Sequence, residues 1–216
     1  MRHPLVIPAL AAALALLPAA AAPVRTLAFD LPATLVSFDI SPSDSPPDHP
    51  VRIHLEARKN QFSDPLAVPA GSYVASSSAF KATAQFTLPD TAGARYLLLI
   101  LPKSDGSWAI LPIPDASAKI GPGDRFLLNA TGEEIAVRFG TLRSNLKPGS
   151  SVVLRPPQPA PKDPRVEVEM VRQVAGEWIP FNSTYWPLDP LARSFVLVHS
   201  DPLTGTPRVR NLSEIP

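Results

Sequence analysis

Proline is the residue that most limits what this chain can fold into. The sequence of 216 residues contains 28 prolines, spread along most of its length. Proline breaks the interior of an α-helix and cannot donate a hydrogen bond in the middle of a β-sheet. Between the prolines, apolar residues rarely recur at the helical period, whereas several stretches alternate strictly between apolar and polar residues. The chain is therefore predicted to be all-β.

Two kinds of strand are visible between the prolines. In the first kind, apolar and polar residues alternate, which is typical of a strand with one buried face and one wet face. These strands are expected at 51–55, 135–139 and 166–170. In the second kind, at 96–101 and 195–198, the residues are continuously apolar. Such runs predict central strands that are covered on both faces.

Turn residues separate these strands at short intervals. Asp105-Gly106 and Thr131-Gly132-Glu133 each lie between two strand-like segments and predict β-hairpins. The segment 155–164 is rich in proline and predicts an extended loop. Many short strands at this spacing are typical of an antiparallel, immunoglobulin-like β-sandwich.

A weak internal repetition bears on the number of sandwiches. Ala94-Arg95 and Ala192-Arg193 each open an apolar run that a glycine turn follows. The alternating strands at 51–55 and 135–139 are also each followed by a turn that contains proline and glycine. Chance similarity between short strands is the alternative explanation. If the repetition is real, it predicts a drifted duplication.

The expected organisation is a leader followed by two sandwich units in tandem. The bounds are 1–22 for the leader, 23–118 for the first unit and 119–216 for the second. Each unit then has the size of an immunoglobulin-like domain. One large sandwich is the alternative.

The first 22 residues predict a secretory signal peptide. Arg2 and His3 precede an apolar stretch from Leu5 to Leu17, and alanines follow it. Cleavage is expected after Ala21, or alternatively after Ala22. The apolar stretch is shorter than the roughly 20 residues that a membrane-spanning helix needs. We therefore expect a protein without a membrane span, exported to the periplasm or the exterior of a bacterium.

Composition removes several function classes. The sequence has no cysteine, which excludes disulfides, thiol nucleophiles and cysteine-ligated metals. It holds 20 Lys and Arg against 19 Asp and Glu, and loss of Arg2 with the leader leaves 19 of each. This balance gives no reason to expect nucleic acid as a partner. No cofactor-binding motif is present in the sequence, so no cofactor is expected.

Histidine offers two candidate sites, and neither is favoured. His49 and His54 lie near Asp48, but two histidines five residues apart on an extended chain point to opposite faces. His199 precedes Ser200-Asp201, so these three residues offer the serine, histidine and acid of a candidate catalytic triad. No nucleophile elbow accompanies it. We therefore expect no metal site and no catalytic triad.

Glu167 and Glu169 form a pair of carboxylates on one face of the strand at 166–170. Their separation is about 7 Å from the strand rise, which could suit glycoside chemistry. That chemistry also needs a buried acid whose pKa is raised. A solvated pair on the wet face is the favoured interpretation.

Aromatic residues gather at one place in the sequence. They are Trp178, Phe181, Tyr185 and Trp186. Exposed aromatic platforms stack against sugar rings or peptides, and the polar neighbours could orient a ligand by hydrogen bonds. The alternative, which we favour, is that these rings plug one end of the core. If a ligand-binding site exists, this cluster is where it is expected.

A family resemblance rests on the segment from Phe126 to Gly140, which reads FLLNATGEEIAVRFG, and on Leu146-Lys147-Pro148-Gly149 after it. This pattern resembles exported bacterial β-sandwich proteins of unknown function, as does the stretch from Ser183 to Trp186 with the apolar strand after Arg193. The resemblance implies an immunoglobulin-like or related sandwich. It implies no known activity and carries over no functional residue.

Three functions fit these observations. The leading hypothesis is a non-catalytic exported protein that binds another envelope protein or a glycan. The alternative is a structural or assembly accessory of the cell envelope that pairs its strand edges with those of partners. The third is a hydrolase whose active-site residues are dispersed over several loops.

Overall fold

The structure is a computed structural model that describes residues 21–31, 33–46, 48–49, 51–103, 105–156 and 164–215. The described chain is all-β, as the prolines predict, and its strands are β1–β16. Most of the expected leader, residues 1–20, and the centre of the proline-rich loop, residues 157–163, lie outside the described residues. No helix in the described part is long and apolar enough to cross a membrane.

Strands β1–β8 form two four-stranded sheets in the first half of the chain. One sheet has the order β4-β1-β7-β8, with β1 at Ala21–Ala28, β4 at Leu66–Pro69, β7 at Tyr96–Pro102 and β8 at Trp108–Pro114. The other has the order β3-β2-β5-β6, with β2 at Leu35–Pro42, β3 at Ile53–Arg58, β5 at Gly71–Ser76 and β6 at Ala84–Leu88.

Strands β9–β16 form two further sheets in the second half, after the 3-10 helix η1 at Ala116–Ala118. One has the order β12-β9-β15-β16, with β9 at Arg125–Asn129, β12 at Ser151–Leu154, β15 at Arg193–Ser200 and β16 at Pro207–Glu214. The other has the order β11-β10-β13-β14, with β10 at Ile135–Phe139, β11 at Leu142–Leu146, β13 at Arg165–Val174 and β14 at Glu177–Pro187.

The two halves share one topology. Each strand of the first half has a counterpart eight strands later with the same sheet neighbours, so β4-β1-β7-β8 corresponds to β12-β9-β15-β16 and β3-β2-β5-β6 to β11-β10-β13-β14. Each half also contains one parallel pair, β1 with β7 and β9 with β15, among otherwise antiparallel pairs. This correspondence supports a duplication, and we keep 23–118 and 119–216 as the proposed bounds of its two units.

The structure corrects part of the repetition proposed from the sequence. Ala94-Arg95 and Ala192-Arg193 do lie at the starts of corresponding strands, since Ala94-Arg95 leads into β7 and Arg193 is the first residue of β15. The strands at 51–55 and 135–139 do not correspond, because the first contains the start of β3 and the second is β10, the counterpart of β2. A turn with proline and glycine is too common a signal to align strands by itself.

One of the two predicted hairpins is wrong. Asp105-Gly106 does join the antiparallel pair β7 and β8. Thr131-Gly132-Glu133 instead joins β9 to β10, which belong to different sheets. The buried side chain of Asn129 holds this crossing, because its Nδ2 donates to the carbonyls of Glu133 and Leu146 and its Oδ1 accepts from the amide of Thr131.

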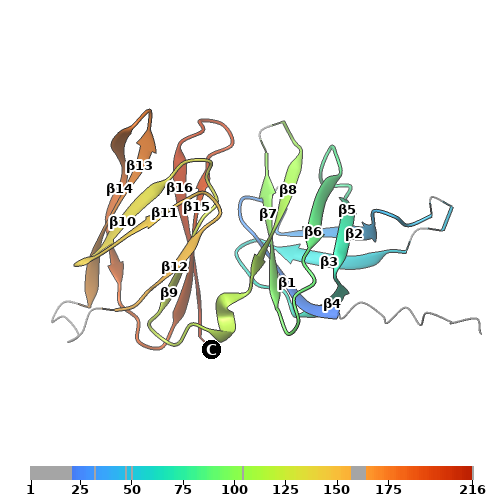
Figure 1. Ribbon diagram of the computed structural model, residues 1–216, viewed down its shortest axis with the longest axis horizontal. Helices are drawn as coiled ribbons and strands as arrows, with labels where there is room; N and C mark the ends of the chain where they lie inside the picture. Colours follow the sequence, from blue (N-terminus) through green and yellow to red (C-terminus); the bar gives the residue numbers. More distant parts are fainter. Residues whose placement is uncertain are drawn as a thin grey trace, which may run out of the picture.

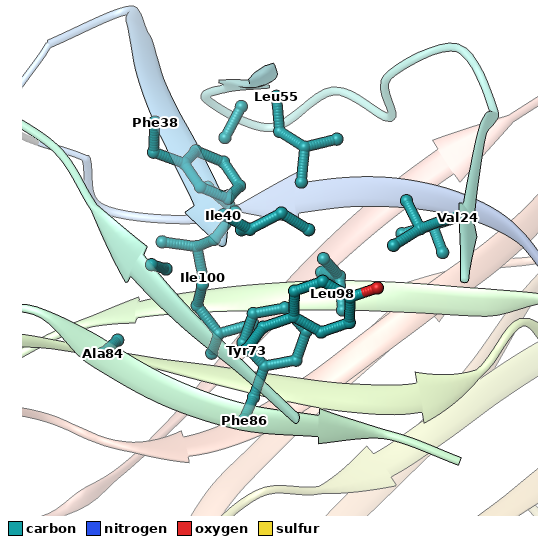
Figure 2. Packing of buried hydrophobic residues seen from close by; sticks show 14 of the residues in the cluster. Val24, Phe38, Ile40, Leu55, Tyr73, Ala84, Phe86, Leu98 and Ile100 are labelled. Atoms are coloured by element: carbon teal, nitrogen blue, oxygen red, sulfur yellow. The ribbon is translucent and has the colours of Figure 1, made fainter. Parts of the chain in front are cut away.

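The four sheets stack as layers (Figure 1). Three hydrophobic clusters lie between them. One cluster lies within each half. In the first half it joins Phe38 and Ile40 of β2 to Leu98 and Ile100 of β7 (Figure 2). The third cluster joins the two halves and draws on β1, β7, β8, β9 and β15. We call β4-β1-β7-β8 and β12-β9-β15-β16 the inner sheets, and the other two the outer sheets.

This stacking explains the continuously apolar strands. In β7, Leu98 and Ile100 point into the core of the first half, whereas Leu97 and Leu99 point into the cluster between the halves. In β15, Val196 and Val198 belong to the core of the second half, and Phe195 and Leu197 to the cluster between the halves. Both faces of these strands are buried, as the sequence predicts.

Ion pairs surround the cluster between the halves. Arg25 of β1 contacts Glu214 of β16 at 3.1 Å, and Arg193 contacts the same carboxylate at 2.7 Å. Arg210 of β16 forms a bidentate contact with Asp30, with its closest approach at 2.6 Å. The contacts of Arg25 with Glu214 and of Arg210 with Asp30 link the two halves, and such directional contacts favour one orientation of the halves over others.

Candidate functional site

The aromatic cluster of the sequence is divided between the core and the surface. Trp186 is buried, at 9% exposure, and its ring lies 6.2 Å from that of Phe139. Phe181 is partly buried against the core of the second half. Trp178 and Tyr185 are exposed, at 41% and 62%. The structure therefore does not bring the four rings together on one surface.

A β-bulge in β14 decides where Trp178 points. The register with β13 passes from Met170 opposite Asn182 directly to Val171 opposite Pro180, so Phe181 is an extra residue. Side chains alternate between the two faces of a strand, and one extra residue reverses the alternation beyond it. Trp178 would share the inward phase of Trp186 in a regular strand. With the bulge, it shares the outward phase of Val171.

The outward side chains of this outer sheet form regular rows across β11, β10, β13 and β14. One row consists of Arg143, Arg138, Glu169 and Ser183. The next row, two residues along each strand, consists of Asn145, Ala136, Val171 and Pro180. Gln173 and Trp178 face each other in the row after that. Two residues of strand correspond to about 7 Å, so long side chains flank a row of small ones.

The small residues form the floor of a depression on this face. Its volume is about 360 Å³, and its lining includes Ala136, Val171, Arg143, Asn145 and Trp178. The depression crosses the full width of the sheet, which is about 14 Å between the backbones of the outermost strands. These dimensions suit a small ligand or a short segment of a chain. We call this surface the outer-sheet depression.

Arg138 organises the charges beside the outer-sheet depression. Its guanidinium donates to both carboxylate oxygens of Glu169, with contacts of 3.0 and 2.7 Å, and contacts Glu167 at 3.1 Å. These hydrogen bonds raise the pKa of Arg138 above its ordinary value and lower the pKa of Glu169 below its own. Glu169 is therefore ionised at neutral pH, and it lacks the raised pKa that a glycosidase acid needs.

The trio of His199, Ser200 and Asp201 is not arranged as a catalytic triad. Nδ1 of His199 lies 3.1 Å from the backbone carbonyl oxygen of Ser200. Asp201 accepts hydrogen bonds from the amides of Leu203 and Thr204, so it closes the turn before β16. Burial lowers the pKa of His199 below its ordinary value. The contacts of His199 and Asp201 therefore hold the end of β15 and the turn that follows it.

The histidines of the first half do not gather ligands for a metal. His54 lies on the exposed face of β3, and its Nδ1 lies 2.9 Å from Asp39. His49 is exposed in the loop before β3. Among the described residues, no group of three histidines and carboxylates could hold a metal ion.

The sequence did not identify Arg138, Arg143 and Asn145 as candidate residues. The alternating pattern indicated Arg138 in part, because this residue lies on the polar phase of the strand 135–139. Its neighbours across the sheet, Arg143 and Glu169, are five residues and thirty-one residues away in the sequence. Only the register of β10 with β11 and β13 places them in one row.

Comparisons with known proteins leave the family open. No protein-family model matches the chain, and none of the curated proteins matches it. Among solved structures, the cryo-electron microscopy structure of the membrane pore complex of pneumolysin aligns with a TM-score of 0.34 and 11% sequence identity. That alignment covers 71% of this chain and 32% of the pneumolysin chain, so the present chain spans about a third of its length.

Proposed function

We propose that the protein is an exported, non-catalytic glycan-binding protein that holds its ligand in the outer-sheet depression. The observation that carries the proposal is Trp178, an exposed indole at the side of a depression whose floor is small and apolar. Sugar rings stack on exposed indole faces of this kind. The expected signal peptide supports the exported location.

Polar groups also line the outer-sheet depression. Asn145 supplies an amide that can donate and accept, and Arg138 is oriented by its contacts with Glu167 and Glu169. Ligand sites in proteins combine apolar contact area with a few oriented polar groups of this kind. The low pKa of Glu169 also favours binding over glycoside hydrolysis.

Strand addition at sheet edges has less support as the function. The exposed edge strand β14 contains Pro180 and the bulge at Phe181, and β8 contains Pro112 and Pro114. Proline and bulges are the features by which proteins prevent pairing at an edge. A protein partner from the envelope is the other occupant that the experiment below can reveal.

The proposal is tested with the exported form of the protein and a panel of soluble polysaccharides. Two of its three tryptophans, Trp108 and Trp186, are buried, so a ligand-dependent change in fluorescence reports mainly on Trp178. Binding is then measured by affinity electrophoresis for the variants. Trp178→Ala is expected to weaken binding about tenfold or more, since aromatic stacking contributes on the order of 1.5 kcal/mol.

Tyr185→Ala is the matched control, because Tyr185 is an exposed ring on the same strand that does not line the depression. It is expected to bind like the wild type. If no polysaccharide binds, or if both variants bind like the wild type, the proposal is wrong. Capture of an envelope protein that depends on Trp178, without glycan binding, would replace the glycan with a protein ligand.

A further inference from the structure

The charged groups beside the outer-sheet depression neutralise one another. Arg138 and Arg143 lie in one row with Glu169, and Glu167 contacts Arg138 at 3.1 Å. Two guanidinium groups and two carboxylates together carry no net charge. The hydrogen bonds from Arg138 and, to a smaller extent, the charges of Arg138 and Arg143 lower the pKa of Glu169. These four groups therefore supply no excess charge that would attract an ionic ligand.

The same row offers hydrogen-bond acceptors as well as donors. The two oxygens of an ionised carboxylate can accept about four hydrogen bonds. Those of Glu169 each contact one nitrogen of Arg138, at 3.0 and 2.7 Å. The carboxylate lines the depression and its side chain is 46% exposed, so its remaining lone pairs are accessible to a ligand. Arg143 adds guanidinium donors to the lining.

Hydroxyl groups match this combination of donors and acceptors. A hydroxyl can donate to a carboxylate and accept from a guanidinium, whereas an anionic oxygen can only accept. An anionic group beside Glu169 would also face a like charge, which raises the energy of binding. The row therefore fits a ligand rich in hydroxyl groups better than an anion.

The rest of the lining is neutral and places an aromatic face on the other side of the floor. Asn145 supplies an amide, and Trp178 supplies the exposed indole. Trp178 faces Gln173, which lies four residues after Glu169 on β13, or about 13 to 14 Å along the strand. A ligand of a few sugar rings can lie on the small apolar floor and contact both sides.

We infer that the ligand is a neutral glycan, in which one sugar stacks on Trp178 and hydroxyl groups of another donate to Glu169. This inference rests on the proposed function and adds the substrate class to it. Glu169 discriminates against acidic glycans, because a carboxylate on the sugar replaces a hydroxyl donor and repels the carboxylate of the protein. Salt is expected to leave the affinity nearly unchanged, since an uncharged ligand has no charge to be screened.

The test compares polymers that share a backbone and differ in charge. Dextran, pullulan and galactomannan are each compared with their carboxymethylated forms, by isothermal titration calorimetry on the exported protein. In each pair that binds, the neutral polymer is expected to bind about fivefold more tightly, as the loss of one hydrogen bond implies.

Glu169→Gln removes the negative charge and keeps the size of the side chain. Two guanidinium groups then face one carboxylate, so the preference for the neutral polymer is expected to disappear or reverse. Binding of the neutral polymer should weaken about fivefold, because a charge-assisted hydrogen bond becomes an uncharged one. Glu56→Gln is the matched control, since Glu56 is an exposed glutamate of β3 that does not line the depression. It makes the same change in total charge and is expected to keep the preference.

The outcomes separate this inference from the proposed function. If the wild type binds a carboxymethylated polymer as tightly as its neutral partner, or more tightly, the neutral ligand is wrong and glycan binding still stands. A preference for neutral polymers that Glu169→Gln retains also overturns the inference. If none of the polymers binds, both proposals are wrong. A neutral preference that is lost in Glu169→Gln and kept in Glu56→Gln supports both.

Discussion

Phe195 is the residue through which the packing of the two halves can be tested most directly. Its side chain is 4% exposed and lies in the cluster between the inner sheets. Its ring centroid is 4.7 Å from that of Phe62, in an edge-to-face contact, and 5.9 Å from that of Phe126. Phe62 belongs to the first half and Phe126 to the second, so the ring contacts both.

Phe195→Ala is expected to lower the free energy of unfolding by about 4 kcal/mol, as is usual for removing a buried phenylalanine. The slope of unfolding in urea should be about 2 to 3 kcal/mol per molar for a chain of this size, so the midpoint should fall by about 1.3 to 2 M. If the halves moved independently, the ring would face water. Its removal would then cost no more than about 0.5 kcal/mol.

The assay is urea unfolding followed by tryptophan fluorescence and by circular dichroism. Trp108 reports on the core of the first half and Trp186 on the core of the second. Halves that are packed together should give one transition with both probes. Tyr185→Ala is the control, since its exposed ring contacts only Arg165 among the recorded ring contacts and should cost less than about 1 kcal/mol. Equal effects of the two substitutions would refute the packing of the halves through this cluster.

Three further predictions concern stability and the candidate site. Because burial lowers the pKa of His199, the unfolded chain binds a proton more readily, so this residue's contribution to stability is complete above pH ~6.5 and declines as the pH falls below that value. In His199→Gln, the loss of unfolding free energy between pH 7.5 and pH 5.5 should therefore be smaller than in the wild type, and an equal loss would contradict this. Asn129→Ala should destabilise by about 3 kcal/mol or more in the same urea assay, since it leaves several buried backbone groups without partners. The exposed Asn211→Ala should change stability by less than about 0.5 kcal/mol, and equal costs for the two would argue against the role of the buried amide. Ala136→Leu should fill the floor of the outer-sheet depression and weaken glycan binding in affinity electrophoresis, with the urea midpoint unchanged; wild-type binding would place the ligand elsewhere.

Local patterns predicted much of the fold because they act between neighbours in the chain. Proline excluded helices wherever it occurred, and alternation marked β10 and β13 and the exposed face of β3. The apolar run of β15 predicted a strand that is buried on both faces. It did not predict which elements cover those faces. The hairpin at Asp105-Gly106 was predicted for the same reason, since its turn residues determine its geometry locally.

The candidate site could be predicted only in part, for a physical reason visible in β14. The sequence identified an aromatic segment, but the order of rings says nothing about which face each ring occupies. That depends on the bulge at Phe181, which exists only in relation to the register with β13. The ion pair of Arg138 with Glu169 depends equally on pairing between distant strands.

The sequence by itself therefore determined the class of fold, the buried strands and the expectation of export. Tertiary structure decided which strands are neighbours, including the parallel pairs β1 with β7 and β9 with β15. It also decided that Thr131-Gly132-Glu133 crosses between sheets, and that Glu169 and Trp178 line one depression. The reason is that backbone preferences are set by adjacent residues, whereas register and the choice of face are set by contacts between residues far apart in the chain.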